Sequence, residues 1–182
     1  MYSTARLSKR VAELGRAISR DFAGRTIDVV VMLDSSFIFA ADLMRRIPGP
    51  MVCHFLHADV RDLTSPEGDR REIYFSAQPR LAGRDVLLVD AVLHTGLTQD
   101  FLCKRLREMG PRSLRLAVLV DKPAERRIDV KADYFGFCIA SKYVSGYGLA
   151  GSRGHYRNLP YIGVRQGRRR VGAGRSRQVR KP

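Results

Sequence analysis

The sequence has no tryptophan, only three cysteines and no long apolar run. A membrane-spanning helix needs roughly 18 consecutive apolar residues, so a helical integral membrane protein is excluded. Cys53, Cys103 and Cys138 lie far apart and show no CxxC or Cys/His ligand spacing. This pattern predicts free, mostly buried thiols in a reducing compartment. We expect a cytoplasmic location; an organellar one is the alternative, although Glu13 and Asp21 argue against an N-terminal transit peptide.

Acidic residues are scarce, above all near the C-terminus. The chain has 33 Lys and Arg against 18 Asp and Glu, a formal net charge of +15. Segment 165–182 holds eight of these basic residues and no acid, so removing its eight charges from +15 leaves +7 on residues 1–164. Such an excess attracts polyanions, namely nucleotides, nucleic acid or an anionic surface. The tail also lacks aromatics, which suits contact with a phosphate backbone, as in RNA; a merely solubilising tail is the alternative.

The residues that are present suffice for one globular domain. A length of 182 residues is close to that of a single domain, and 45% hydrophobic residues can build a core. We therefore expect one domain over 1–164, followed by a basic Arg/Gly-rich tail over 165–182.

The hydrophobic pattern alternates between helix and strand. Apolar residues recur every three to four positions from Leu7 to Phe22, which predicts an amphipathic helix, and further helices are expected over 37–47 and from about 99 to 109. Short apolar runs predict strands at 27–33, 51–56, 72–76, 86–93, 114–120, 134–139 and 161–164, with a polar loop over 61–71. Strands that alternate with helices indicate a mainly parallel α/β sheet, whose ligands bind beyond the carboxyl ends of the strands.

One strand ends in a turn that suits phosphate. Thr95, Gly96, Leu97 and Thr98 follow the strand at 86–93 and lead into a helix. Backbone N–H groups and the positive end of the helix dipole attract an anion there, and the glycine permits close approach. A purely structural cap is the alternative interpretation.

The order of several segments resembles a known family. VLLVDAVLHTGLT, VLVDKP, DYFGFCIASKYVSGYG and HYRNLPYIGV follow one another as in the purine phosphoribosyltransferases of the hypoxanthine-guanine type, over about 11–164. The resemblance implies a type I phosphoribosyltransferase-like α/β fold, with a central parallel sheet flanked by helices and a small hood formed partly near the termini. It also implies that a purine base and magnesium-bound 5-phosphoribosyl pyrophosphate give a nucleoside monophosphate and pyrophosphate, usually in a dimer or tetramer.

The resemblance assigns binding roles to individual residues. It implies that the turn 95–98 cradles the 5′-phosphate and that Asp90 binds the ribose. On the purine side, Lys122 donates to the exocyclic oxygen, Tyr143 stacks on the base and Val144 meets its edge through backbone groups. Arg157 matches an arginine near the pyrophosphate. A solvated Lys122 and a core Tyr143 are the structural alternatives.

The chain departs from the family pattern at the reacting groups. Ala91 replaces one of two adjacent ribose acids, and His94 replaces the aspartate beside purine N7. Asp34 stands where the family has a lysine at the pyrophosphate, and Ala150 where an acid helps to hold magnesium. The Ser-Tyr pair of the mobile loop aligns with Val60 and Arg61.

These substitutions remove residues that contact the ribose, the pyrophosphate and the metal, whereas the residues that contact the purine and the 5′-phosphate remain. We therefore expect a catalytically impaired homologue that binds GMP or IMP. An active purine salvage enzyme is the alternative, since His94 can exchange a proton with N7; magnesium would then be needed. A second alternative is a ribonucleoprotein component on a retired enzyme fold. No protein-bound metal is expected, because His54 and His57 lie three apart on a predicted strand and point to opposite faces.

Overall fold

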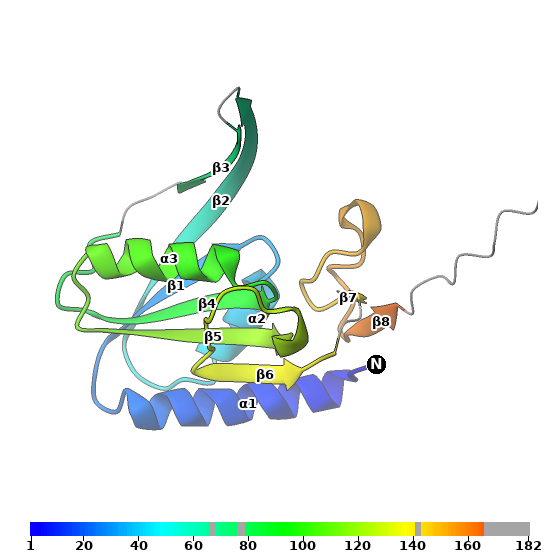
Figure 1. Cartoon of the computed structure of the whole chain (residues 1–182). Coiled ribbons are helices and arrows are strands. Elements are labelled where there is room, and N and C mark those ends of the chain that lie inside the picture. The colour runs from blue at the N-terminus through cyan, green and yellow to red at the C-terminus, as the bar shows by residue number, and fades with distance from the viewer. Residues whose placement is uncertain (66–67, 76–78, 141–142, 166–182) are drawn as a thin grey trace, which may run out of the picture.

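A single mixed sheet forms the centre of the molecule (Figure 1). The computed structural model describes residues 1–65, 68–75, 79–140 and 143–165, with only the backbone at 58–65, 68–75, 152 and 165. The sheet order is β3-β2-β1-β4-β5-β6, and the five strands from β2 to β6 in this order pair in parallel, while β3 pairs antiparallel with β2. Its strands are β1 (Ile27–Leu33), β2 (Met51–Ser65), β3 (Gly68–Phe75), β4 (Asp85–Leu93), β5 (Ser113–Asp121) and β6 (Tyr134–Cys138).

Helices cover both faces of this sheet. α1 (Thr4–Asp21) and α2 (Phe37–Met44) pack against each other on one face, and α3 (Leu97–Glu108) lies on the other. α1 begins where the Ser3 side chain accepts a hydrogen bond from the Arg6 backbone N–H. The predicted central parallel sheet with flanking helices is thus confirmed.

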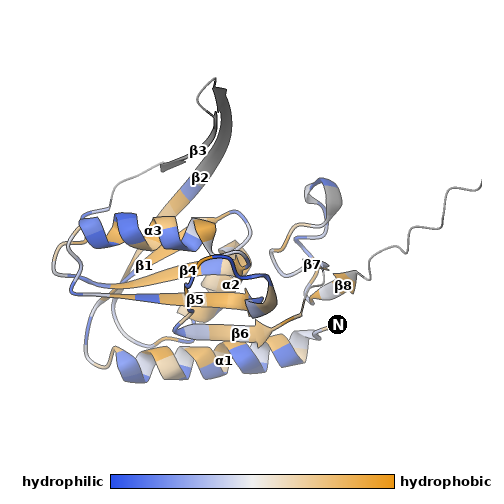
Figure 2. Ribbon diagram, in the orientation of Figure 1, coloured by the Kyte–Doolittle hydropathy of each residue, from blue (hydrophilic) through white to orange (hydrophobic). Residues whose placement is uncertain are grey.

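Alternate residues of the central strands build two hydrophobic layers. In β1, Val29 and Val31 pack toward α1 and α2, whereas Val30 and Met32 pack toward α3. β4 and β5 follow the same alternation, which explains why their sequences are continuously apolar. Figure 2 shows these strands as the most hydrophobic ribbons of the molecule. Within the described residues, no helix has both the length and the hydropathy to span a membrane.

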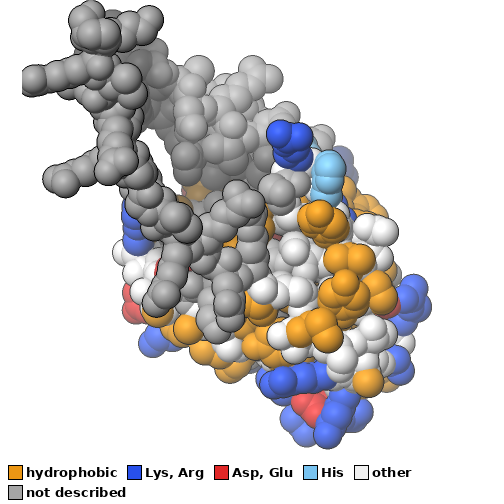
Figure 3. All heavy atoms as spheres, turned by 90° about the vertical axis from the view of Figure 1, so that its right-hand side faces the viewer, with side chains coloured by type: hydrophobic (Ala, Val, Ile, Leu, Met, Phe, Trp, Pro, Cys, Tyr) orange, Lys and Arg blue, Asp and Glu red, His pale blue; other side chains and the backbone are white. Residues whose placement is uncertain are grey.

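A second, two-stranded sheet forms a small hood beside the carboxyl ends of the main strands. It pairs β7 (Tyr143–Ser145) with β8 (Gly163–Arg165), and the N-terminal segment joins it because Tyr2 and Ile162 exchange backbone hydrogen bonds of 2.9 and 3.0 Å. Two short 3₁₀ turns, η1 (Pro123–Glu125) and η2 (Ser152–Gly154), lie in the connections. Figure 3 views this end of the molecule and shows hydrophobic side chains gathered there, with Lys and Arg around them.

Three expectations need correction, and one lies outside the structure. The segment 61–71 is not a polar loop where it is described, because β2 and β3 pair from Ala58 with Phe75 to Ser65 with Gly68. The second helix ends at Met44 instead of 47. The cysteines are free but not mostly buried: only Cys103 is buried, while Cys53 and Cys138 are exposed. The tail lies outside the described residues beyond Arg165.

A buried acid ties the amino ends of β4 and β5 together. Asp85 is 1% exposed and accepts hydrogen bonds from Arg112, from Arg25 Nη1 at 3.1 Å and from Ser113 Oγ at 2.6 Å. The hydrogen bond from Arg112 lowers the pKa of Asp85; burial opposes this, and Ser113 and the charge of Arg25 reinforce it. The carboxylate is therefore stabilised in its charged form.

Asp85→Asn should lower the free energy of unfolding at pH 7 by about 1–3 kcal/mol, because it leaves the arginines without their buried partner. Because the pKa of Asp85 is lower in the folded state, its contribution is present above the unfolded value of about 3.9 and is lost as the pH falls through the folded value. Urea denaturation at pH 7 and at about pH 3 measures both effects. Glu108→Gln, on an exposed pair, is the control; an equal loss at both pH values would contradict the assignment.

Candidate functional site

Asp90 lies near the carboxyl end of β4, and two hydrogen bonds hold its carboxylate inside the protein. Oδ2 accepts from the Gln99 side-chain amide at 2.6 Å, and Oδ1 accepts from the Ala91 backbone N–H at 2.6 Å. Burial raises the pKa of Asp90, and the two hydrogen bonds only partly offset this rise. Gln99 belongs to the first turn of α3, so this helix holds the acid at the end of the strand.

The turn between β4 and α3 depends on a glycine. Gly96 is the N-cap residue of α3, with φ of +87°, and has no side chain to cap the helix; the Thr95 hydroxyl accepts a hydrogen bond from the Leu97 backbone N–H at 3.5 Å. A Cβ at position 96 would lie 3.0 Å from the Ile128 carbonyl oxygen and 3.2 Å from Arg126 Cδ. Only glycine combines this φ with such close packing. The first backbone N–H groups of a helix have no partner within the helix and can bind an anion.

The segment after β5 packs directly on this turn. The backbone N–H groups of Arg127 and Ile128 donate to the Thr95 carbonyl oxygen at 2.9 and 3.2 Å, and the Lys122 N–H donates to the Leu93 carbonyl oxygen at 3.0 Å. These bonds join the ends of β4 and β5. They bring the side chains of segment 121–128 to the turn.

Three charged or titratable side chains meet there. Glu125 accepts a hydrogen bond from His94 Nε2 through Oε2, and its Oε1 lies 4.0 Å from Lys122 Nζ. The Lys122 side chain is only 11% exposed, so it is not a solvated surface lysine. The neighbouring Arg126 pairs with Asp121, and both are largely buried.

A second pair of opposite charges links the main domain to the hood. Arg157 Nη1 donates to Ser35 Oγ at 2.9 Å and to the Gly148 carbonyl oxygen at 2.8 Å, and its Nη2 lies 4.0 Å from Asp34 Oδ2. His57 Nδ1 lies 3.5 Å from Asp34 Oδ1. The loop after β1 and the chain between β7 and β8 therefore meet at a carboxylate flanked by a guanidinium and an imidazole.

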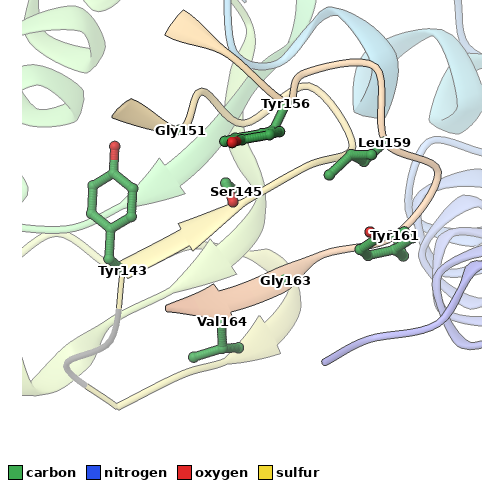
Figure 4. A pocket seen from close by; sticks show the side chains of 8 residues that line it. All are labelled: Tyr143, Ser145, Gly151, Tyr156, Leu159, Tyr161, Gly163 and Val164. Atoms are coloured by element: carbon green, nitrogen blue, oxygen red, sulfur yellow. The ribbon is translucent and has the colours of Figure 1, made fainter. Parts of the chain in front are cut away.

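The hood contains a pocket with aromatic walls (Figure 4). Its volume is about 460 Å³, a size typical of small-molecule sites. It is lined by Tyr143, Ser145, Gly151, Tyr156, Leu159, Tyr161, Gly163 and Val164. Tyr143 is half-exposed, with its hydroxyl 3.2 Å from the Ala150 carbonyl oxygen. Gly151 has no room for a Cβ, which would lie 2.5 Å from the Tyr156 ring.

The residues singled out from the sequence fall into two groups. Asp90, His94, the turn 95–98 and Lys122 gather at the carboxyl ends of β4 and β5. Tyr143 and Val144 lie on β7, and Arg157 lies between β7 and β8. Tyr143 lines the aromatic pocket, whereas the Val144 side chain is buried in the main core. Val60 and Arg61 lie in β2 where only the backbone is described.

Two residues at the site were not anticipated, Gln99 and Glu125. Gln99 lies on the first turn of a predicted helix, where a polar side chain needs no special explanation. Glu125 stands three residues after Lys122, and this spacing could have indicated a contact between the two. The contact with His94 could not be predicted, because it joins residues 31 positions apart. His54, by contrast, contacts the buried Asp28 at 2.9 Å and so has a structural partner.

The fold and this geometry define an α/β protein with its candidate ligand site at the carboxyl edge of a parallel sheet, beside a small hood. The phosphoribosyl transferase domain family matches residues 2–150. A bifunctional TilS/HprT protein of Listeria monocytogenes is 31% identical over 164 residues, which are 90% of this chain. The chain spans only 25% of the length of that relative.

Solved structures agree with the family match. A hypoxanthine-guanine phosphoribosyltransferase from Bacillus anthracis is 34% identical, with a TM-score of 0.78 over 89% of this chain and 94% of that one. A hypoxanthine phosphoribosyltransferase mutant from Trypanosoma cruzi, complexed with the product IMP, is 26% identical, with a TM-score of 0.82 over 92% and 89%. The chain therefore belongs to the phosphoribosyltransferase family and is a homologue of the hypoxanthine-guanine enzymes.

Proposed function

We propose that the chain binds a purine nucleoside monophosphate, GMP or IMP, and transfers a phosphoribosyl group poorly or not at all. The observation that carries this proposal is the contrast between two parts of the site. The turn 95–98 keeps a helix N-terminus whose N-cap is a glycine, which leaves room for a phosphate, whereas Asp34 places a carboxylate beside Arg157, where the family binds pyrophosphate.

On the purine side, several features favour retained binding. In this proposal the backbone N–H groups of the turn 95–98 bind the 5′-phosphate, and Lys122 donates to the exocyclic oxygen of the base. Lys122 is largely buried near His94, so its position suits a preformed binding site. Tyr143 stacks on the base and Val144 offers backbone groups to its edge. The relative from Trypanosoma cruzi is complexed with IMP, which supports this ligand class.

On the pyrophosphate side, the charges oppose binding. The side chain of Asp34 is 61% exposed, so its carboxylate is available to repel an anionic leaving group. Arg157, the proposed pyrophosphate ligand, already contacts Ser35, Gly148 and Asp34. Binding pyrophosphate would therefore require the guanidinium to leave partners within its own chain.

The chain also has fewer of the acidic groups that take part in the family's reaction. Asp90 is the proposed ribose ligand, but its carboxylate is engaged by Gln99 and by the Ala91 N–H, and Ala91 offers no second acid. Magnesium is usually held by one or two carboxylates together with substrate phosphates. Ala150 supplies no carboxylate where the family has an acid, so this position does not fit magnesium. His94 remains as a group that can exchange a proton with purine N7.

One alternative function and two further proposals accompany this function. An active purine salvage enzyme is the alternative, and its basis is His94. A homo-oligomer, which the resemblance implies, stays a prediction. The division into a domain over 1–164 and a tail over 165–182 is likewise proposed.

Calorimetric titration distinguishes nucleotide binding with impaired transfer from an active purine salvage enzyme. GMP and IMP should bind the protein, with about one nucleotide per chain, whereas magnesium-bound phosphoribosyl pyrophosphate should give no measurable heat of binding in the same buffer. Tight binding of both ligand classes, together with nucleotide formation from hypoxanthine or guanine, would establish the active enzyme instead. Absence of nucleotide binding would refute the proposal.

Asp34→Lys should raise the affinity for phosphoribosyl pyrophosphate by roughly tenfold or more, because it replaces an anion with a cation about 4 Å from Arg157, the proposed pyrophosphate ligand. At that separation one charge pair is worth about 1 kcal/mol even in water. The affinity for GMP should change by less than about threefold. Glu108→Lys makes the same charge change at the far end of α3 and serves as the control. Equal effects of both substitutions would contradict a local role for Asp34.

We also propose that the basic surface binds a polyanion such as RNA. The support is the net charge of +15 together with the exposed basic residues on α1, which are Arg6, Lys9, Arg16 and Arg20. If about six phosphates are neutralised, the affinity for single-stranded RNA should fall roughly 300-fold between about 50 and 200 mM salt. Replacing Arg168, Arg169 and Arg170 by Gln should weaken binding and flatten this slope. Absence of binding at low salt, or a flat slope, would exclude this partner.

A further inference from the structure

A carboxylate links the two cationic or titratable groups proposed for the purine side of the site. Glu125 accepts a hydrogen bond from His94 Nε2, and its second oxygen lies 4.0 Å from Lys122 Nζ. The side chain of Glu125 is 27% exposed, against 47% for His94. The carboxylate therefore lies deeper than the imidazole that it contacts.

The backbone holds Glu125 in this place. The Glu125 N–H donates to the Lys122 carbonyl oxygen at 3.2 Å at the start of η1. Shortly after Glu125, the N–H groups of Arg127 and Ile128 donate to the Thr95 carbonyl oxygen. The segment packs so closely on Gly96 that a Cβ there would lie only 3.0 Å from the Ile128 carbonyl oxygen. Glu125 is thus fixed relative to the turn that carries His94.

This contact selects one protonation pattern of the imidazole. A neutral histidine carries its proton on one ring nitrogen, and the hydrogen bond of that nitrogen decides which one. An ionised carboxylate can only accept. The contact with Glu125 therefore keeps the proton on Nε2 and leaves the lone pair on Nδ1.

We propose that Glu125 is a positioning residue that makes His94 the proton acceptor for the purine. In this step, which rests on the proposed function and belongs to the residual transfer that it leaves to the chain, the proton on purine N7 moves to Nδ1 of His94, and the electron pair of the N7–H bond stays on the purine ring. The resulting imidazolium is stabilised by the negative charge of Glu125. The same carboxylate holds Lys122 beside the base.

The tautomer can be measured on the protein without any ligand. At about pH 9, above the ordinary pKa of histidine, the nitrogen NMR spectrum of the imidazole rings reports which nitrogen carries the proton. The protein has four histidines, so the spectrum is assigned by substitution: the signal that disappears in His94→Asn belongs to His94. We expect the proton on Nε2 in the wild type, the same state in Glu125→Gln, whose amide oxygen still accepts, and a mixture of tautomers in Glu125→Ala.

Glu108→Ala, which removes an exposed carboxylate paired with Arg105, is the control and should leave the His94 signal unchanged. A proton on Nδ1 in the wild type, or an unchanged signal in Glu125→Ala, would overturn the proposal. Because no nucleotide is present, failure of GMP or IMP to bind refutes the proposed function without affecting this readout.

Transfer activity gives the second readout, measured in the Asp34→Lys variant because its affinity for phosphoribosyl pyrophosphate is expected to be restored. With hypoxanthine and magnesium-bound phosphoribosyl pyrophosphate, adding Glu125→Ala to this variant should lower kcat about tenfold or more, and KM for the base should change less. Such a loss lies below the 10²–10⁴-fold typical of complete removal of a general base. Glu125→Gln in the same background should recover part of the rate, since it keeps the tautomer and loses only the charge. Equal rates with and without Glu125→Ala would overturn the role in proton transfer even if the tautomer changes.

Discussion

The contact between the turn after β4 and the segment after β5 is the constraint on which the candidate site depends. The Thr95 carbonyl oxygen accepts two backbone N–H groups of that segment, and Gly96 has no side chain to keep it away. This packing brings Lys122 and Glu125 to His94, and it requires a glycine without a side chain at the N-cap of α3. The sheet supports the contact, because β4 and β5 are parallel and their carboxyl ends lie at one edge.

The charges of the site are balanced within the chain, although the chain as a whole is strongly basic. Glu125 contacts His94 and lies near Lys122, while Asp34 lies near Arg157 and His57. Each acid thus occupies a place near cationic or titratable groups that an anionic ligand would otherwise use. Hydrogen bonds within the chain also engage Asp90. This internal pairing is the physical basis for proposing nucleotide binding with impaired transfer.

Much of the fold could be predicted from hydrophobic periodicity, because the central strands are buried on both faces and α1 on one. The strand at 27–33 was predicted with its observed bounds, and the helix over 7–22 lies within one residue of the observed end. The strands at 51–56 and 72–76 were predicted too short, because the many charged residues of segment 61–71 show no apolar alternation, yet backbone hydrogen bonds pair β2 and β3 there. The exposure of Cys53 and Cys138 was also missed, because the face on which a strand residue lies depends on what packs there.

The sequence by itself determined the α/β class, the family and the composition of the turn 95–98, because these follow from local periodicity and from contiguous motifs. The tertiary structure decided which charges meet. His94 and Glu125 are 31 residues apart, Asp34 and Arg157 are far more distant along the chain, and neither pair can be inferred from spacing alone. Only the folding of β1, β4, β5 and the hood to one edge brings these groups within a few ångströms, where electrostatic attraction between them becomes strong.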